Sequence, residues 1–151
     1  MTHIWIDADS CPSKIRNYVV NYSKQKNLEV IFAANKPFKT DCNDFKMIVC
    51  NKTKDSADNY ILENAGENDL VITRDILFAS RLVERKIRTI NDRGTSFTID
   101  NIKNRLEDRE FDLQLAQLGF GGNKKTYGEK EFAKFKKCFE KEIERLLANN
   151  F

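Results

Sequence analysis

Short apolar runs recur along the first 91 residues of the chain, and amphipathic stretches separate several of them. Runs of this kind, bounded by polar or turn-forming residues, are typical of buried strands, whereas the stretches between them show helical spacing. Strands that alternate with helices indicate βαβ units with right-handed crossovers. The chain is therefore predicted to be an α/β protein with a mainly parallel sheet. The predicted strands are residues 4–6, 28–34, 45–50, 69–75 and 87–91.

Helix signals lie between these strands. Pro12 suits a first helical turn. Ile15, Val19 and Tyr22 then recur at helical spacing, which predicts a helix from residue 12 to about residue 26. Two further helices are predicted at residues 55–66 and 76–86.

The last third of the chain departs from this alternation. Residues 92–95 are predicted to form a loop, and Thr98 or Asp100 to cap a helix that runs to about Leu118. A glycine-rich stretch, residues 119–128, is predicted to be a mobile loop. The terminal helix carries one apolar stripe, which is typical of a docking face on the protein's own core. The stripe consists of Phe132, Phe135, Phe139, Ile143 and Leu146.

Length and composition restrict the class of protein. With 151 residues, 40% hydrophobic and 32% charged, the chain fits one globular domain. No stretch has the features of a secretion signal, and no apolar run reaches the roughly 18 residues needed to span a bilayer, so a cytoplasmic location is expected. The formal charge of +3 neither indicates nor opposes nucleic-acid binding.

Cysteine and histidine chemistry is disfavoured. The four cysteines, at positions 11, 42, 50 and 138, form no Cys-x-x-Cys pair, which argues for reduced thiols and against structural zinc. The single histidine, His3, lies at the start of the first predicted strand, far from its carboxyl end. Cys11 lies near a helix N-terminus, but a thiolate there would be repelled by Asp7 and Asp9, so we interpret it as a packing or capping residue.

Acidic residues recur where predicted strands end. Asp7 and Asp9 follow the first strand, Asp75 the fourth and Asp92 the fifth, and Asp58 lies in the helix after the third. Because the carboxyl ends of parallel strands share one edge of a sheet, these carboxylates are predicted to converge there. Convergent carboxylates at neutral pH favour a hard divalent cation, Mg²⁺ or Mn²⁺. Such an ion supports hydrolysis of phosphate esters without histidine or cysteine.

Each acid also has a simpler interpretation. Asp75 can be a helix N-cap, and Asp55 with Asp58 resembles a carboxylate version of the capping box. Asp9 can be a cap or turn former, whereas Asp7 lies too early to cap a helix that begins at Pro12. The predicted phosphate-binding residues are the cations beside the strand ends: Lys36, Arg74 and Arg93.

The sequence resembles the bacterial YaiI/YqxD family, which is grouped with PIN-like and NYN-type nuclease domains. The resemblance rests on stretches in one order that begin with Asp-Ala-Asp-Ser-Cys-Pro at residues 7–12. The others are residues 34–37, 55–61, 69–79, 91–95 and 101–102.

The resemblance implies a PIN-like α/β/α sandwich over residues 1–118. The loop at 119–128 then joins it to a C-terminal helix, 129–151, on the same domain. Asp7, Asp58 and Asp75 would be the catalytic acids, with Asp9 and Asp92 as further metal ligands. The implied substrate is RNA.

Two other functions stay open at this point. Asp7-x-Asp9 after an apolar strand also matches the opening motif of haloacid-dehalogenase-type phosphatases, in which the first Asp is the nucleophile. Alternatively, the protein binds RNA or a protein partner without cleaving it. A homo-oligomer is compatible with either reading.

Overall fold

The computed structural model describes residues 2–8, 11–35, 46–49, 56–120 and 127–148, and these build a six-stranded sheet between two layers of helices. The strands lie in the order β3-β2-β1-β4-β5-β6, and all neighbouring pairs are parallel except β5 and β6. They are β1 (His3–Asp7), β2 (Glu29–Ala34), β3 (Lys46–Val49), β4 (Leu70–Ile72), β5 (Arg88–Ile90) and β6 (Ser96–Phe97). The predicted α/β class with a mainly parallel sheet is confirmed.

Side-chain alternation along the strands separates two cores. Ile4 and Ile6 of β1 face one side of the sheet with Phe32 of β2, while Trp5 faces the other with Ile31. This follows from the period of two along a strand, and strands that are apolar on both faces need a cover on each.

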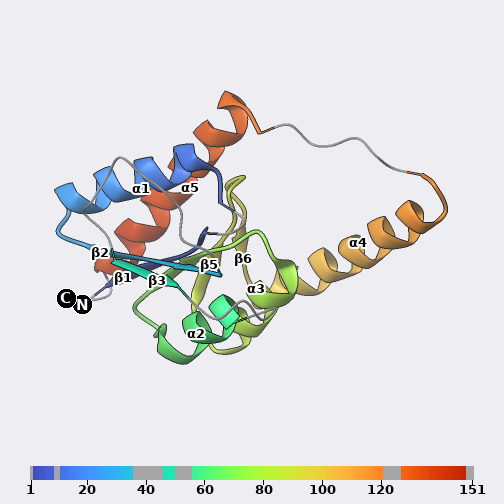
Figure 1. Ribbon diagram of the computed structural model, residues 1–151, viewed down its shortest axis with the longest axis horizontal. Helices are drawn as coiled ribbons and strands as arrows, with labels where there is room; N and C mark the ends of the chain where they lie inside the picture. Colours follow the sequence, from blue (N-terminus) through green and yellow to red (C-terminus); the bar gives the residue numbers. More distant parts are fainter. Residues whose placement is uncertain (1, 9–10, 36–45, 50–55, 121–126, 149–151) are drawn as a thin grey trace.

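Helices α1 (Ser13–Gln25) and α5 (Glu129–Ala148) cover the first face of the sheet (Figure 1). Helices α2 (Ser56–Asn64) and α3 (Ile76–Glu84) cover the other. The result is the three-layer α/β/α arrangement. Four of the five stripe residues of α5 are buried, Phe132 being only half-buried, so that stripe is a docking face on the protein's own core.

Helix α4 (Ile99–Gln117) differs from the other four helices. Only Ile102 is buried along its 19 residues, packed with Ala79 and Val83 of α3 and Phe97 of β6. Beyond that contact the helix extends away from the sheet (Figure 1). Phe111 and Leu113 are exposed on it, and so is Leu118 at its C-cap.

Two sequence expectations need correction. The predicted strand at 69–75 is only Leu70–Ile72, because the Asp69 side chain closes a turn by accepting a hydrogen bond from the Gly66 amide (2.9 Å) and Asp75 already begins α3. β6 was missed, since two residues are too short to show alternation.

The start of α4 decides between the two predicted caps. Its N-cap is Thr98 and not Asp100. The Thr98 hydroxyl accepts from the Asn101 amide at 3.2 Å, and the Asn101 side chain accepts from the Thr98 amide at 2.8 Å. Asp100 lies in the first turn instead.

Within the described ranges, no helix is both long and apolar enough to cross a membrane. Of the four cysteines, Cys11 and Cys138 are free thiols, whereas Cys42 and Cys50 lie outside the described residues. Asp55 and most of the predicted loop at 119–128 also lie outside them. His3 lies at the amino edge of the sheet, between Glu29 (3.1 Å) and Asp69 (3.2 Å).

Candidate functional site: an acidic crevice at the carboxyl edge

A small crevice of about 150 Å³ of empty space lies where β1, β4 and β5 end, and it is too narrow to hold a water molecule as it stands. We call it the acidic crevice. The chain leaves β1 toward β2 and β3 on one side and then crosses back to β4 on the other, so the strand order reverses between β1 and β4. Open α/β sheets bind ligands at such a switch point. The lining residues are Asp7, Cys11, Ile72, Thr73, Arg74 and Asp92.

Asp7 is tied across the switch point to the end of β4. It is only 6% exposed, and its Oδ2 accepts a hydrogen bond from the Thr73 hydroxyl at 3.0 Å. The Thr73 oxygen in turn accepts from the Asp75 backbone amide at 3.1 Å. Asp7 and Asp75 therefore share one edge of the sheet, with Thr73 between them.

The Asp75 carboxylate is used by its own helix. Its Oδ1 accepts hydrogen bonds from the amides of Leu77 (3.0 Å) and Phe78 (3.3 Å), which makes Asp75 the N-cap of α3. N-caps satisfy amides that have no partner within the helix. The capping interpretation of Asp75 is thus confirmed.

Asp92 is the second buried carboxylate of the crevice. It is 2% exposed, and its Oδ2 accepts from Arg74 Nε at 3.0 Å and from Arg74 Nη2. Its Oδ1 is buried and has no hydrogen-bond partner among the described residues. A buried carboxylate oxygen without a donor or cation is costly, so this atom is where a ligand gains most by binding.

The loop that carries Asp92 is held from three sides. The Asn91 side chain accepts from the amides of Arg93 and Thr95, both at 2.9 Å. The Tyr127 hydroxyl donates to the Asp92 carbonyl at 2.7 Å. Gly94, with φ of +82°, lets the loop approach α5 so closely that a Cβ would stand 2.5 Å from the Lys134 carbonyl oxygen. The position of Asp92 is thus set by the turn and by α5.

Cys11 borders the same crevice as a protonated thiol. Burial raises its pKa to about 12, and the charges of Asp92 and Asp7 act in the same direction against the nearby Arg16 and Arg74. A thiol of this kind is a poor nucleophile, because the thiolate is the reactive form.

The structure brings together some of the predicted site residues. Asp7, Arg74 and Asp92 line the crevice, and Asp75 is joined to it through Thr73. Asp58 lies half-buried in the first turn of α2 and is not among the described residues that line the crevice. Asp9 and Lys36 fall outside the described residues.

Of the two predicted phosphate-binding arginines, Arg74 lines the crevice and Arg93 follows Asp92 in the loop after β5. The Arg74 side chain is 50% exposed, so it holds Asp92 and still reaches solvent. The Arg93 side chain is 30% exposed, and its guanidinium carbon lies 5.8 Å from the Tyr127 ring centroid and its Nη1 3.9 Å from Glu131.

The carboxylate oxygens of the crevice are suitable ligands for a hard cation, but they are few. No group of three potential metal-ligating side chains occurs within the described parts of the chain. What they supply is two buried carboxylates, of which Asp92 pairs with Arg74 through one oxygen while its Oδ1 has no hydrogen-bond partner among these residues. Carboxylate oxygens are what Mg²⁺ and Mn²⁺ take from proteins, usually one or two with water and substrate oxygens completing the shell.

Sequence reasoning missed Thr73 and Tyr127 as contributors to this site. Thr73 carries a signal, because a hydroxyl two residues before Asp75 ends an otherwise apolar strand. Tyr127 carries none, since only the packing of α5 on the sheet brings it to the loop after β5.

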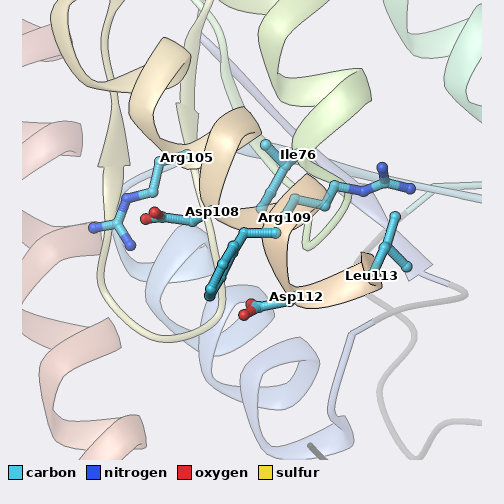
Figure 2. A pocket seen from close by; sticks show the side chains of 7 residues that line it. Ile76, Arg105, Asp108, Arg109, Asp112 and Leu113 are labelled. Atoms are coloured by element: carbon cyan, nitrogen blue, oxygen red, sulfur yellow. The ribbon is translucent and has the colours of Figure 1, made fainter. Parts of the chain in front are cut away.

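A larger hollow of about 470 Å³ opens beside Ile76, the residue after Asp75, and along α4 (Figure 2). Arg105 and Asp108 point to one side of α4 there, and Arg109 extends to the other (Figure 2). With Asp112, the hollow has two basic and two acidic side chains. It therefore has no net charge with which to attract a phosphate.

Fold and crevice together define the class: a three-layer α/β/α protein whose paired carboxylates lie at the switch point of a mainly parallel sheet. Residues 5–149 match the family described as "Uncharacterized BCR, YaiI/YqxD family". The chain belongs to that family.

Relatives of the chain extend over nearly its whole length. It is 41% identical to a UPF0178 protein of Treponema denticola over 145 residues, 95% of this chain and 93% of the relative. It is 35% identical to a UPF0178 protein of Psychromonas ingrahamii over 144 residues, 94% and 95% of the two chains. A UPF0178 protein of Pseudomonas entomophila is 34% identical over 146 residues, 95% of each. No solved structure matches the chain.

Proposed function

We propose that the protein is a divalent-metal-dependent nuclease that hydrolyses phosphodiester bonds, with RNA as its substrate and Mg²⁺ or Mn²⁺ as its cofactor. The kinship with PIN-like and NYN-type nuclease domains is part of this proposal. The observation that carries it is the buried Asp92 Oδ1, which has no partner among the described residues and lies in the same crevice as buried Asp7.

Electrostatic repulsion between two acids supports a cation site at this place. Asp7 and Asp92 are two buried carboxylates in one crevice, and the half-exposed Arg74 pairs with Asp92. A doubly charged ion bound by both carboxylates would reduce their repulsion. Asp7 and Asp92 would hold it, with Asp9, Asp58 and Asp75 as further proposed ligands.

The residues of the chain then have separate tasks. A bound Mg²⁺ or Mn²⁺ supplies a Lewis acid that activates water and neutralises charge on a phosphodiester. Thr73 orients Asp7 by donating to its Oδ2, and Arg74 fixes one oxygen of Asp92 so that the other stays available. Arg74 and Arg93 bind phosphate oxygens, because a guanidinium pairs with them in a planar, bidentate geometry.

The test is a calorimetric titration of Mn²⁺ into the wild type, Asp7→Asn and Asp92→Asn. Losing a carboxylate ligand is expected to weaken binding by at least about tenfold in each variant. Asp100→Asn is the matched control, since it removes one exposed carboxylate on α4 and is expected to change nothing. Asp75→Asn is less informative, because it also weakens the α3 cap by about 1 kcal/mol.

A cleavage assay on single-stranded and structured RNA completes the test. Metal-dependent cleavage that is lost in Asp7→Asn and Asp92→Asn supports the proposal. Metal affinity that is unchanged in both variants would contradict the site. Metal binding without cleavage would favour a binding module, and turnover of p-nitrophenyl phosphate with a phosphoryl group trapped on Asp7 would favour the phosphatase.

A further inference from the structure

A basic groove of about 440 Å³ runs between α5 and the segment that contains β6, on the far side of the loop that carries Asp92. We define it by four cations of α5 and two residues that face them. These are Lys134, Lys137, Lys141 and Arg145, and Gly94 and Ser96. All four cations are exposed.

The four cations form one face of α5. Their spacing of three, four and four residues repeats the helical period, so they lie above one another along the helix. At a rise of 1.5 Å per residue, the row from Lys134 to Arg145 is about 16 Å long. That length matches on the order of three to five consecutive phosphates of a nucleic-acid strand.

Two acidic residues of α5 are engaged away from the groove. Glu140 accepts a hydrogen bond from the Tyr18 hydroxyl of α1, and Glu131 accepts from the Gly128 amide at 2.9 Å. Of the five lysines of this helix, three line the groove.

Glu142, at the base of the groove, does not cancel this charge. It is 5% exposed and accepts hydrogen bonds from Arg88 (2.7 Å) and from Arg145 (3.3 Å), and from the Ser96 hydroxyl (3.0 Å). A carboxylate with two guanidinium partners and a hydroxyl has little negative potential left to repel an anion.

We propose that the basic groove binds the sugar–phosphate backbone of single-stranded nucleic acid. The row of cations and the concave shape point to a flexible polyanion, because a flat anionic surface cannot follow a groove between a helix and a sheet edge. The groove also adjoins the acidic crevice, since Gly94 of the groove and Asp92 of the crevice are two residues apart in one tight turn. The choice of ligand rests on the proposed function. The bound strand would run from the groove past Arg93 to the outside of the crevice.

The test is fluorescence anisotropy with labelled 12-nucleotide RNA and DNA in EDTA, so that binding is measured without cleavage. About four phosphate contacts predict a slope near −3 for log affinity against log salt. The double variant Lys137→Gln/Lys141→Gln is expected to bind about tenfold more weakly at low salt, with a slope reduced by roughly 1.4. Lys103→Gln/Lys136→Gln, which removes the same charge outside the groove, is expected to bind within twofold of wild type.

Three results would overturn the proposal. The first two are no binding by the wild type at 50 mM salt, and an equal loss of binding in the groove and control variants. Loss of binding to anionic phospholipid vesicles in the groove variant, with oligonucleotide binding unchanged, would also overturn it in favour of a membrane surface. Similar affinities for RNA and DNA support recognition of the backbone. A preference for one of them identifies which nucleic acid the groove binds. Asp7→Asn is expected to bind in EDTA as wild type does, so failure of the nuclease proposal is distinguishable from failure of this one.

Discussion

At the scale of single residues, Thr73 and Asp92 explain the crevice. One hydroxyl joins the carboxylate that ends β1 to the backbone that begins α3, through bonds of 3.0 and 3.1 Å. One arginine takes a single oxygen of Asp92 and leaves the other without a donor among the described residues. Protein interiors rarely leave a buried carboxylate oxygen unpaired, which is why this atom marks the site.

Cys11 yields a prediction of pH dependence. Because burial raises the pKa of its thiol to about 12, the thiolate fraction at pH 8 is about 10⁻⁴, against roughly a quarter for an ordinary thiol. Alkylation of Cys11 by iodoacetamide is expected to be slow at pH 8 in the folded protein and fast in guanidinium, as followed by peptide mass spectrometry. The shift also lowers the free energy of unfolding as pH rises from about 9 toward 12, because the thiol then loses its proton only in the unfolded chain. Cys11 is partly exposed, so rapid labelling of the folded protein at pH 8 would show that the pKa of its thiol is not raised.

At the scale of elements, the turn between β5 and β6 joins the sheet to α5. Gly94 allows that contact, and Gly119 has the same φ of +82° at the end of α4. There the amides of Gly119 and Phe120 bond back to Ala116 (3.1 Å) and Leu115 (2.9 Å), which closes the helix. The two glycines share a backbone conformation and differ in their surroundings.

Alanine substitutions at these two glycines distinguish the cost of backbone strain from the cost of a steric clash. Gly119→Ala is expected to lower the free energy of unfolding by about 1–2 kcal/mol, because nothing lies within 4 Å of its new Cβ. Gly94→Ala is expected to cost about 1–3 kcal/mol more, since its Cβ would stand 2.5 Å from the Lys134 carbonyl oxygen. Urea unfolding measures both, and equal costs would mean that the turn does not press on α5.

At the scale of the whole molecule, the sheet and α4 differ in how deeply their aromatic side chains are buried. The face under α1 and α5 contains a cluster of aromatic rings around fully buried Phe139, which lies 5.3 Å from Tyr22 and 6.0 Å from Tyr18 between ring centroids. Helix α4, in contrast, leaves Phe111 60% exposed. Burial therefore concentrates stability on the sheet and leaves α4 marginal beyond Ile102.

Phe139→Ala is expected to lower the free energy of unfolding by about 3–5 kcal/mol, because it opens a cavity between α5 and α1. Phe111→Ala is the matched change on an exposed helix and is expected to stay within about 0.5 kcal/mol of wild type. Urea unfolding at several protein concentrations measures both. A large cost for Phe111→Ala would show that α4 is covered in solution.

Much of the architecture follows from local patterns in the sequence. The strands up to β5, the helices and the convergence of Asp7, Asp75 and Asp92 on one edge follow from apolar periodicity and from the polarity of parallel strands. Those signals lie within a few residues of one another. Short-range patterns did not reveal β6, because two residues show no period, and did not choose Thr98 over Asp100 as the α4 cap.

Tertiary structure decided the rest, because long-range contacts leave no local trace. Only the packing of α5 on the sheet brings Tyr127 to Asp92 and places the row of Lys137 and Lys141 in one groove with Gly94 and Ser96. Only the geometry at the end of β4 decides which acid has which role. Asp75 caps α3, whereas Asp7 and Asp92 line the crevice. Which side chains a buried carboxylate meets depends on residues 18 to 66 positions away, and a pattern of neighbouring residues carries no information about them.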